Sequence, residues 1–189
     1  MRESKSRPES WLTYMSIRPY IAKLVKAKVL HAYVPPSQHR ARRCLFLTDE
    51  AMKDLTSSSG LISLLALRGL VEAELKRWVH NGRVWVDLQG KPRFLKPLDP
   101  PPPEIWELRF TDPRVQIRLF GRFAEPNTIV GTKFHTRQML GRKGSRDWRR
   151  AMTSCEGRWN ELFPDMPPFS GKTIHEYVTE NCDDFPIHI

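Results

Sequence analysis

The sequence has few cysteines, no long apolar run and a shortage of acidic side chains. Its three cysteines, Cys44, Cys155 and Cys182, are widely spaced and form no CxxC or CxxxC pair, so neither a disulfide framework nor a zinc knuckle is predicted. No apolar stretch approaches the roughly 18 residues that a membrane-spanning helix requires, and the opening residues MRESKSRPES lack the apolar core of a secretory signal. These absences favour a protein of the reducing cytoplasm, without a membrane partner.

Positive charge is what the chain has in excess. It carries 31 Lys and Arg against 21 Asp and Glu among 189 residues, which gives a formal net charge of +10. The excess is concentrated between Glu104 and Arg150, where eleven cationic side chains stand against five acidic ones. Such a surface attracts an anionic partner, and a nucleic-acid backbone is the simplest candidate. The length suits one globular domain with extensions, or at most two small domains.

The first 41 residues are predicted to form a basic helical extension. Apolar residues recur there at three- and four-residue steps, the period of an amphipathic helix: Ile17, Ile21, Leu24, Val25 and Val29. Pro35 and Pro36 end this pattern. Two interpretations are open. The helix packs on the main domain with its lysines in solvent, or it is a basic arm that lies on nucleic acid.

One strand and a core helix are predicted in the next part of the chain. The apolar run within Arg42–Thr48 indicates a short strand, and Thr48 or Asp49 offers an N-cap for a helix that follows it. Leucines at helical spacing between Gly60 and Val79 predict a core helix. Asn81-Gly82 is expected to end that helix, because both residues tolerate a left-handed backbone.

A proline-rich connection and three strands follow. Residues 90 to 103 are predicted to form a loop or surface strap, since their prolines exclude regular ladder pairing. Apolar and polar residues then alternate over residues 105–110, 115–123 and 128–137, with turns at the prolines between them. This alternation predicts an antiparallel meander of three strands.

The alternation also predicts on which face of the sheet each cationic side chain of the meander lies. In the second strand, Arg118 and Arg122 are expected on the face opposite the apolar residues. In the third strand, Lys133 and His135 are expected to share a face with Ile129. A set of outward cations on one sheet face is therefore predicted.

A final helix and an acidic tail complete the chain. Ser145 or Asp147 is predicted to open the helix, one side of which is apolar and belongs to the core. The residues after Phe163 are rich in proline and carry five acids against Lys172 alone. We expect this tail to fold back weakly on the basic face, through attraction that salt would screen.

In this order, the elements resemble the RelE/ParE toxin superfamily over residues 42 to 163. The residues that carry the resemblance are Trp106-Glu107-Leu108-Arg109, Arg118 within VQIRLFGRF, Lys133-Phe134-His135-Thr136-Arg137, and a helix entered through SRDWRRA. They look like the phage- and plasmid-associated HigB-like branch. The resemblance implies an α+β fold with a RelE-like antiparallel sheet, a helical pair and a C-terminal helix. Two segments lie outside the region of resemblance: the basic helical extension of residues 1 to 41 and the acidic tail of residues 164 to 189.

The resemblance also implies a function. Such a protein would be the toxin of a type II toxin-antitoxin system, a ribosome-associated mRNA endoribonuclease that uses the RNA 2′-hydroxyl as its nucleophile. That chemistry would need no metal and no cofactor. Its partners would be mRNA, the ribosome and a cognate antitoxin. Two alternatives are open: a nucleic-acid-binding or regulatory protein of a phage or mobile element without catalysis, and a ParE-like toxin that acts on a protein.

Three residues are the catalytic candidates under this resemblance. Arg118 matches the strand arginine of the family and would stabilise the phosphorane-like transition state; the alternative is a surface arginine paired with Glu107. His135 would be a general acid or base; the alternative is a packed or solvent-facing histidine. Arg137 matches the second basic position at the end of the family's third meander strand.

The RNA-binding candidates are the other cations of the region, namely Arg109, Arg122, Lys133, Arg142 and Lys143. Arg109 belongs to the ELR motif and either braces the sheet or touches RNA. Arg142 and Lys143 lie in a glycine-flanked loop and are interpreted as mobile phosphate contacts or as a solvated charge run. His175 and Tyr177 of the tail are further candidates for reaching the site.

Overall fold

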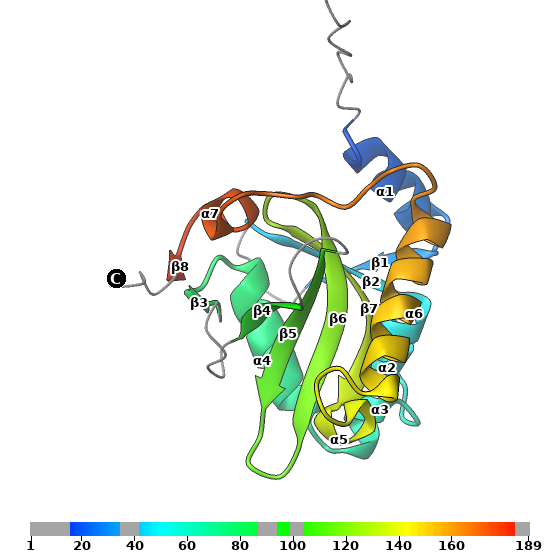
Figure 1. Cartoon of the computed structure of the whole chain (residues 1–189), viewed down its shortest axis with the longest axis vertical. Helices are drawn as coiled ribbons and strands as arrows, with labels where there is room; N and C mark the ends of the chain where they lie inside the picture. The colour runs from blue at the N-terminus through cyan, green and yellow to red at the C-terminus, as the bar shows by residue number, and fades with distance from the viewer. Residues whose placement is uncertain (1–15, 35–41, 87–93, 99–103, 184–189) are drawn as a thin grey trace, which may run out of the picture.

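An open, mixed sheet of six strands with helices on both faces forms the body of the protein, so the fold is α+β (Figure 1). The structure is a computed structural model and describes residues 16–34, 42–86, 94–98 and 104–183. Within these segments, no helix combines the length and the apolar character needed to cross a membrane.

The sheet has the strand order β1-β2-β7-β6-β5-β4. These strands are β1 (Leu30–Ala32), β2 (Cys44–Thr48), β7 (Thr128–Thr136), β6 (Gln116–Glu125), β5 (Ile105–Thr111) and β4 (Leu95–Leu98). Every neighbouring pair is antiparallel except β2 and β7, which run parallel. The expectation of a purely antiparallel sheet was therefore wrong for this pair. Three helices and strands β3 (Val84–Trp85) to β6 lie between β2 and β7 in the chain, so no hairpin joins the two strands and they can pair in the parallel direction.

The three central strands, β5, β6 and β7, form the predicted antiparallel meander. The register places Arg109 opposite Arg118, and Arg118 opposite His135. These three residues therefore lie in one row across adjacent strands. The row is near the end of the strands where α5 (Arg137–Leu140) follows β7 (Figure 1).

A bulge in β7 changes the predicted facing of its residues. Thr132 is skipped in the register, because Gly131 and Lys133 on either side of it pair with consecutive residues of β6. A bulge shifts the alternation by one residue. Ile129 consequently points into the core beneath α4, whereas His135 contacts an aromatic ring of the opposite core. The prediction that Lys133 and His135 share a face with Ile129 was wrong for this reason.

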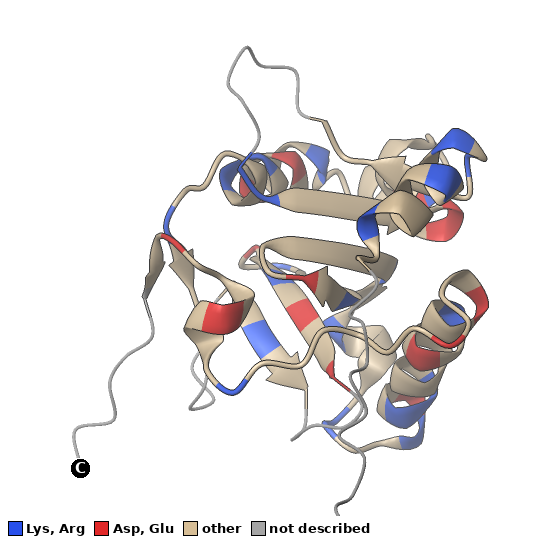
Figure 2. Ribbon diagram, turned by 90° about the horizontal axis from the view of Figure 1, so that it is seen from above, with Lys and Arg blue, Asp and Glu red and all other residues tan. Residues whose placement is uncertain are grey.

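Helices cover both faces of the sheet. On one face lie α2 (Asp49–Thr56), α3 (Leu61–Leu64) and α4 (Arg68–Val79); on the other lie α6 (Arg146–Leu162) and α1 (Arg18–Lys26). Figure 2 shows charged residues of both signs on the strands between these layers, as well as on the outer sides of the helices. The sheet thus carries ionic groups within a largely apolar sandwich.

The predicted helix starts are confirmed at two caps. The Thr48 hydroxyl accepts from the Ala51 N–H at the start of α2, and the Ser145 hydroxyl accepts from the Trp148 N–H at the start of α6. The predicted core helix is interrupted, however. Ala66 adopts a φ of 53°, and this left-handed turn separates α3 from α4.

The described part of the N-terminal extension belongs to the folded body. Ile17 and Ile21 are buried with the end of α6, and β1 pairs with β2 as an edge strand of the sheet. This placement confirms the interpretation of α1 as a helix packed on the main domain. Strand β1 was not predicted, since its three residues are too few to show an alternation.

Strand β4 lies within the predicted proline-rich strap. Pro97 faces Trp106 in the ladder with β5, so the expectation that ladder pairing is excluded was wrong for Leu95–Leu98. Proline is tolerated there because β4 is the last strand of the six-stranded sheet, whose outer edge forms only an isolated bridge of Leu95 to Val86 within the described residues. The remainder of the strap, residues 90–93 and 99–103, lies outside the described residues.

The described part of the C-terminal tail, residues 164–183, packs into the core instead of lying on the basic face. Its buried residues Ile174, Tyr177 and Val178 join the cluster beneath α4, and β8 (Cys182–Asp183) pairs with β3 (Val84–Trp85). Figure 1 shows α7 (Ile174–Tyr177) at the end of the sheet opposite α5. The expectation of a weak electrostatic contact was wrong, because apolar burial, which salt does not screen, holds this segment.

A buried arginine also holds the tail. The Arg43 guanidinium donates to the Glu180 carbonyl at 2.5 Å and to the Gly82 carbonyl at 2.9 Å, and it lies 5.0 Å from the ring centre of Trp78. Burial lowers the pKa of Arg43 to about 10, although Cys182 and Glu180 oppose the shift. The side chain remains charged at neutral pH and links the residue before β2 to the tail.

Candidate nucleic-acid interface

The row of Arg109, Arg118 and His135 lies on the face of the sheet that α6 covers. The imidazole of His135 lies 5.1 Å from the ring of Phe120, which lies 5.7 Å from Trp148 of α6. Arg118 and Phe120 are two residues apart in β6 and so share this face. The structure therefore brings two predicted cations and the predicted histidine together.

A buried carboxylate orients both arginines of the row. Glu107, only 1% exposed, accepts from Arg109 Nε at 2.6 Å, and its second oxygen lies 3.3 Å from Arg118 Nε without the alignment of a hydrogen bond. Arg118 also donates to the Ile117 carbonyl and to the Gln116 side chain, both at 2.9 Å. The predicted pairing of Arg118 with Glu107 is confirmed, but the pair is buried and not on the surface.

Burial and neighbouring charges act on Arg118. Desolvation lowers its pKa, the Glu107 carboxylate raises it, and the positive charges of Arg109 and Arg137 lower it. The guanidinium stays charged, as arginine does in proteins. Three guanidinium groups are therefore close enough to interact, with one carboxylate between two of them. An added anion would relieve their mutual repulsion.

His135 is uncharged at neutral pH. Burial, chiefly, and then the positive charge of Lys133 lower the pKa of His135 to about 4, while Glu50 raises it. At neutral pH the imidazole of His135 is unprotonated, so it can accept a proton but cannot act as the acid, and its low pKa makes it a weak base. Of the two predicted roles, general base is thus the one that this environment favours.

The depressed pKa of His135 predicts a pH dependence of stability. The unfolded chain takes up the proton near pH 6.5, whereas the folded chain resists protonation until about pH 4. Stability should be unaffected by His135 above pH 6.5 and fall by up to about 1.4 kcal/mol per pH unit below it, about 3 kcal/mol in all. Urea unfolding of wild type and His135→Asn between pH 7 and pH 4 measures the difference. If stability falls equally with pH in the two proteins, His135 is not held neutral in the folded state.

Lys133 lies beside His135 and reaches toward α2. Its ammonium group lies 3.3 Å from Glu50 Oε1, and its side chain is 42% exposed. Helix α2 flanks this part of β7 because β2 pairs with β7 only as far as Gly131. A phosphate at this position would compete with Glu50 for the exposed ammonium group.

Arg137 is the first residue of α5, and it does not continue the strand. Strand β7 ends at Thr136, whose hydroxyl accepts from the Met139 N–H and caps α5. The predicted strand to residue 137 was one residue too long. The guanidinium of Arg137 nevertheless lies on the same side as the row, 5.4 Å from the ring centre of Trp148.

Arg142 and Lys143 are exposed in the turn between α5 and α6. Gly141 and Gly144 on either side have φ values of 63° and 78°, a conformation that favours glycine. The glycines of the predicted loop thus allow a tight turn before α6. The turn places both cations close in sequence to Arg137, on the accessible rim of this surface.

Arg122 shares the face of Arg118, as the alternation predicts, but it lies beneath α6. It is 3% exposed, its Nη2 lies 4.0 Å from Glu156, and its guanidinium lies 5.7 Å from the ring centre of Trp159. Burial lowers its pKa, an effect that Cys155 and Glu156 oppose. This placement does not fit an RNA contact, so Arg122 is left out of the candidate interface.

The tail residues do not reach the site, contrary to expectation. Tyr177 donates to Glu104 Oε2 at 2.8 Å and packs against Trp106, at the end of β5 remote from Arg109. His175 is exposed on the same short helix, α7. These contacts give Tyr177 a structural role, in which burial raises its pKa to about 12.

The structure adds side chains that the sequence did not single out. Glu50 contacts Lys133 from α2, and Phe120 and Trp148 form the aromatic floor beside His135 and Arg137. The alternation of β6 places Phe120 with Arg118, but Glu50 is distant in sequence and no local pattern connects it with the meander. Within the described segments, no group of three or more His, Cys, Asp and Glu residues is positioned to hold a metal ion.

We compared the chain with protein-family models, with curated proteins and with solved structures, and none of the three comparisons gives a significant match.

Proposed function

We propose that the protein is an endoribonuclease toxin of the RelE/ParE type that cuts mRNA on the ribosome. The observation that carries the proposal is the row of Arg109, Arg118 and neutral His135 across three adjacent strands, with Arg137 beside it. The order of the elements supports the RelE-like part: a strand, helices, a three-stranded meander and a final helix. The partners in this proposal are mRNA, the ribosome and an antitoxin.

The chemistry of the row fits cleavage by the RNA itself. The 2′-oxygen attacks the adjacent phosphorus and its proton passes to the neutral imidazole of His135. The bond from phosphorus to the 5′-oxygen breaks, which leaves a 2′,3′-cyclic phosphate and a 5′-hydroxyl that takes its proton from water. The charge of Arg118 and Arg109 stabilises the phosphorane-like transition state, in which negative charge accumulates on the phosphate oxygens. No step in this scheme requires a metal ion.

A second candidate is a nucleic-acid-binding protein without catalysis. The observation that favours it is the enclosure of Arg118, which already bonds to Gln116 and the Ile117 carbonyl and pairs with Glu107. A substrate phosphate has to replace one of these acceptors to reach the guanidinium. The exposed cations Lys133, Arg142 and Lys143 would then account for binding, with an affinity that falls steeply with salt.

Expression in growing cells separates the two candidates. If the chain is a ribosome-dependent nuclease, growth stops and translated transcripts are cut, whereas Arg118→Ala leaves the transcripts intact. Circular dichroism of the purified variant verifies that it is folded, which is needed because Arg118 is buried. Growth arrest with intact transcripts would contradict the nuclease proposal and favour a toxin that acts on a protein. Salt-dependent RNA binding without any cut product would favour the binding protein.

A further inference from the structure

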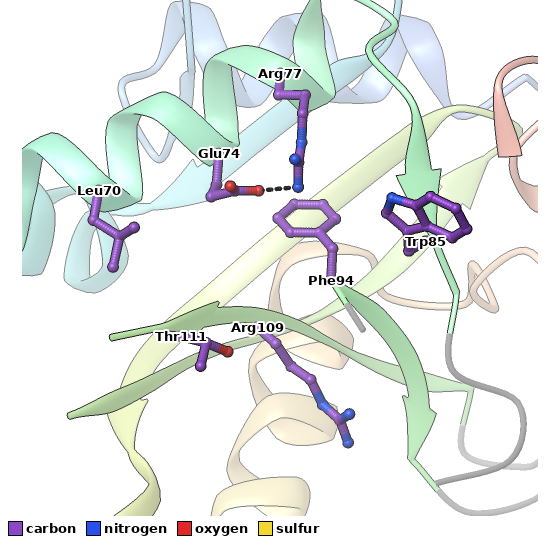
Figure 3. A pocket seen from close by; sticks show the side chains of 7 residues that line it. All are labelled: Leu70, Glu74, Arg77, Trp85, Phe94, Arg109 and Thr111. Atoms are coloured by element: carbon purple, nitrogen blue, oxygen red, sulfur yellow. Dashed lines mark hydrogen bonds and ion pairs between the residues drawn. The ribbon is translucent and has the colours of Figure 1, made fainter. Parts of the chain in front are cut away.

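A small pocket lies at the edge of β5, on the opposite side of the sheet from the row. Its volume is about 210 Å³. Helix α4 contributes Leu70, Glu74 and Arg77, and two aromatic residues, Trp85 and Phe94, complete the wall (Figure 3). Sites for drug-sized ligands measure roughly 300–1,000 Å³, so this pocket suits a single flat ring system.

The aromatic rings of the pocket are paired with guanidinium groups. Arg77 lies 5.7 Å from the ring centre of Phe94 and forms an ion pair with Glu74, and Arg83 lies 5.5 Å from the ring centre of Trp85. Aromatic and guanidinium planes are the surfaces on which nucleic-acid bases stack. Glu74 adds an acceptor for the exocyclic amine of a base.

The edge of β5 adds backbone groups to the pocket. The Arg109 N–H donates to the Phe94 carbonyl at 2.7 Å, toward the side of β4. In an antiparallel ladder the N–H and C=O of alternate residues point to the same edge, so those of Thr111 point to this side as well. Thr111 lines the pocket and brings a donor and an acceptor next to each other, a pattern that matches the hydrogen-bonding edge of a base.

Arg109 connects the pocket with the row. Its backbone borders the pocket, while its side chain extends away from Phe94 toward Glu107 on the other side of the sheet (Figure 3). We propose that this pocket is a base-binding subsite for single-stranded RNA. The RNA backbone crosses the edge of β5, with a phosphate at Arg109 and Arg118 on one side and a neighbouring base in the pocket on the other. The subsite rests on the proposed function, since the row supplies the phosphate contacts.

The test compares two oligomers of equal length and charge, a single-stranded RNA of ten nucleotides and its abasic counterpart, by fluorescence anisotropy. Wild type should bind the RNA more tightly than the abasic oligomer. Trp85→Leu, which keeps an apolar side chain, should weaken RNA binding by roughly 5- to 150-fold and leave the abasic oligomer unaffected. Trp85→Phe keeps an aromatic plane and should retain most of the affinity.

Two results would overturn the subsite. One is an unchanged RNA affinity in Trp85→Leu, and the other is an equal loss for both oligomers, since the lost contact would then not involve a base. If neither oligomer binds wild type, the proposed function fails, and adenosine monophosphate tests the pocket alone. If wild type binds this nucleotide and Trp85→Leu does not, the proposal of a base-binding pocket stands. If wild type does not bind the nucleotide, that proposal is rejected.

Discussion

Replacement of His135 by asparagine is expected to slow RNA cleavage by roughly 10²–10⁴-fold, the usual contribution of general base catalysis. The reason is that His135 is the uncharged proton acceptor in the row, held against Phe120 and opposite Arg118. Asparagine keeps a polar side chain that can form hydrogen bonds but cannot take the proton of the 2′-hydroxyl. RNA affinity should change little, because the cations of the interface remain.

His31→Asn is the matched control for this variant. His31 is also partly buried and contacts a carboxylate, with Nε2 2.5 Å from Asp49, but it lies on β1 and outside the row. Its replacement should leave the cleavage rate unchanged. A cleavage rate in His135→Asn equal to that of wild type would remove His135 from the mechanism, whatever the effect on binding.

Replacement of Glu107 by alanine is expected to destabilise the fold by about 3–5 kcal/mol, the cost of removing one partner from a buried ion pair. Glu107 is 1% exposed and compensates the charges of Arg109 and Arg118, whose side chains are 12% and 8% exposed. Without the carboxylate, two enclosed guanidinium groups repel one another. Urea denaturation measures the loss, and cleavage should fall with it because the arginines lose their orientation.

Glu161→Ala is the control for Glu107→Ala. Glu161 pairs with Arg158 on the outer side of α6, where its side chain is 67% exposed, and such surface pairs contribute about 0–1 kcal/mol. Equal, small losses for the two variants would show that Glu107 does not carry the buried network. Glu107→Gln keeps the shape of the side chain and should fall between wild type and alanine.

The sequence predicted the elements that have a regular period. Alternation located the meander strands, and the capping residues Thr48 and Ser145 marked the starts of α2 and α6. These sequence patterns did not predict features that depend on how strands pair in the folded protein. Pro97 is accepted in β4 only because this strand lies at the edge of the sheet, and the bulge at Thr132 depends on the pairing of β7 with β6.

The candidate site was predictable in part, for the same reason. Spacing along the strands indicated which cations share a face, and the register then placed Arg118 beside His135. The spacing of residues along a strand does not indicate where a helix packs on the sheet. The burial of Arg122 beneath α6 was therefore not predicted. The contact of Lys133 with Glu50 depends on the parallel pairing of β2 with β7, which no local pattern indicates.

The most direct test of the nuclease proposal is the chemistry of the RNA ends. Purified protein is added to ribosomes that are translating a defined mRNA, and the termini of the fragments are determined. We expect 2′,3′-cyclic phosphate and 5′-hydroxyl ends from wild type, and almost no fragments from His135→Asn. An mRNA that remains whole with wild-type protein, or fragments formed equally by His135→Asn, would contradict the proposal that this row of residues cuts RNA.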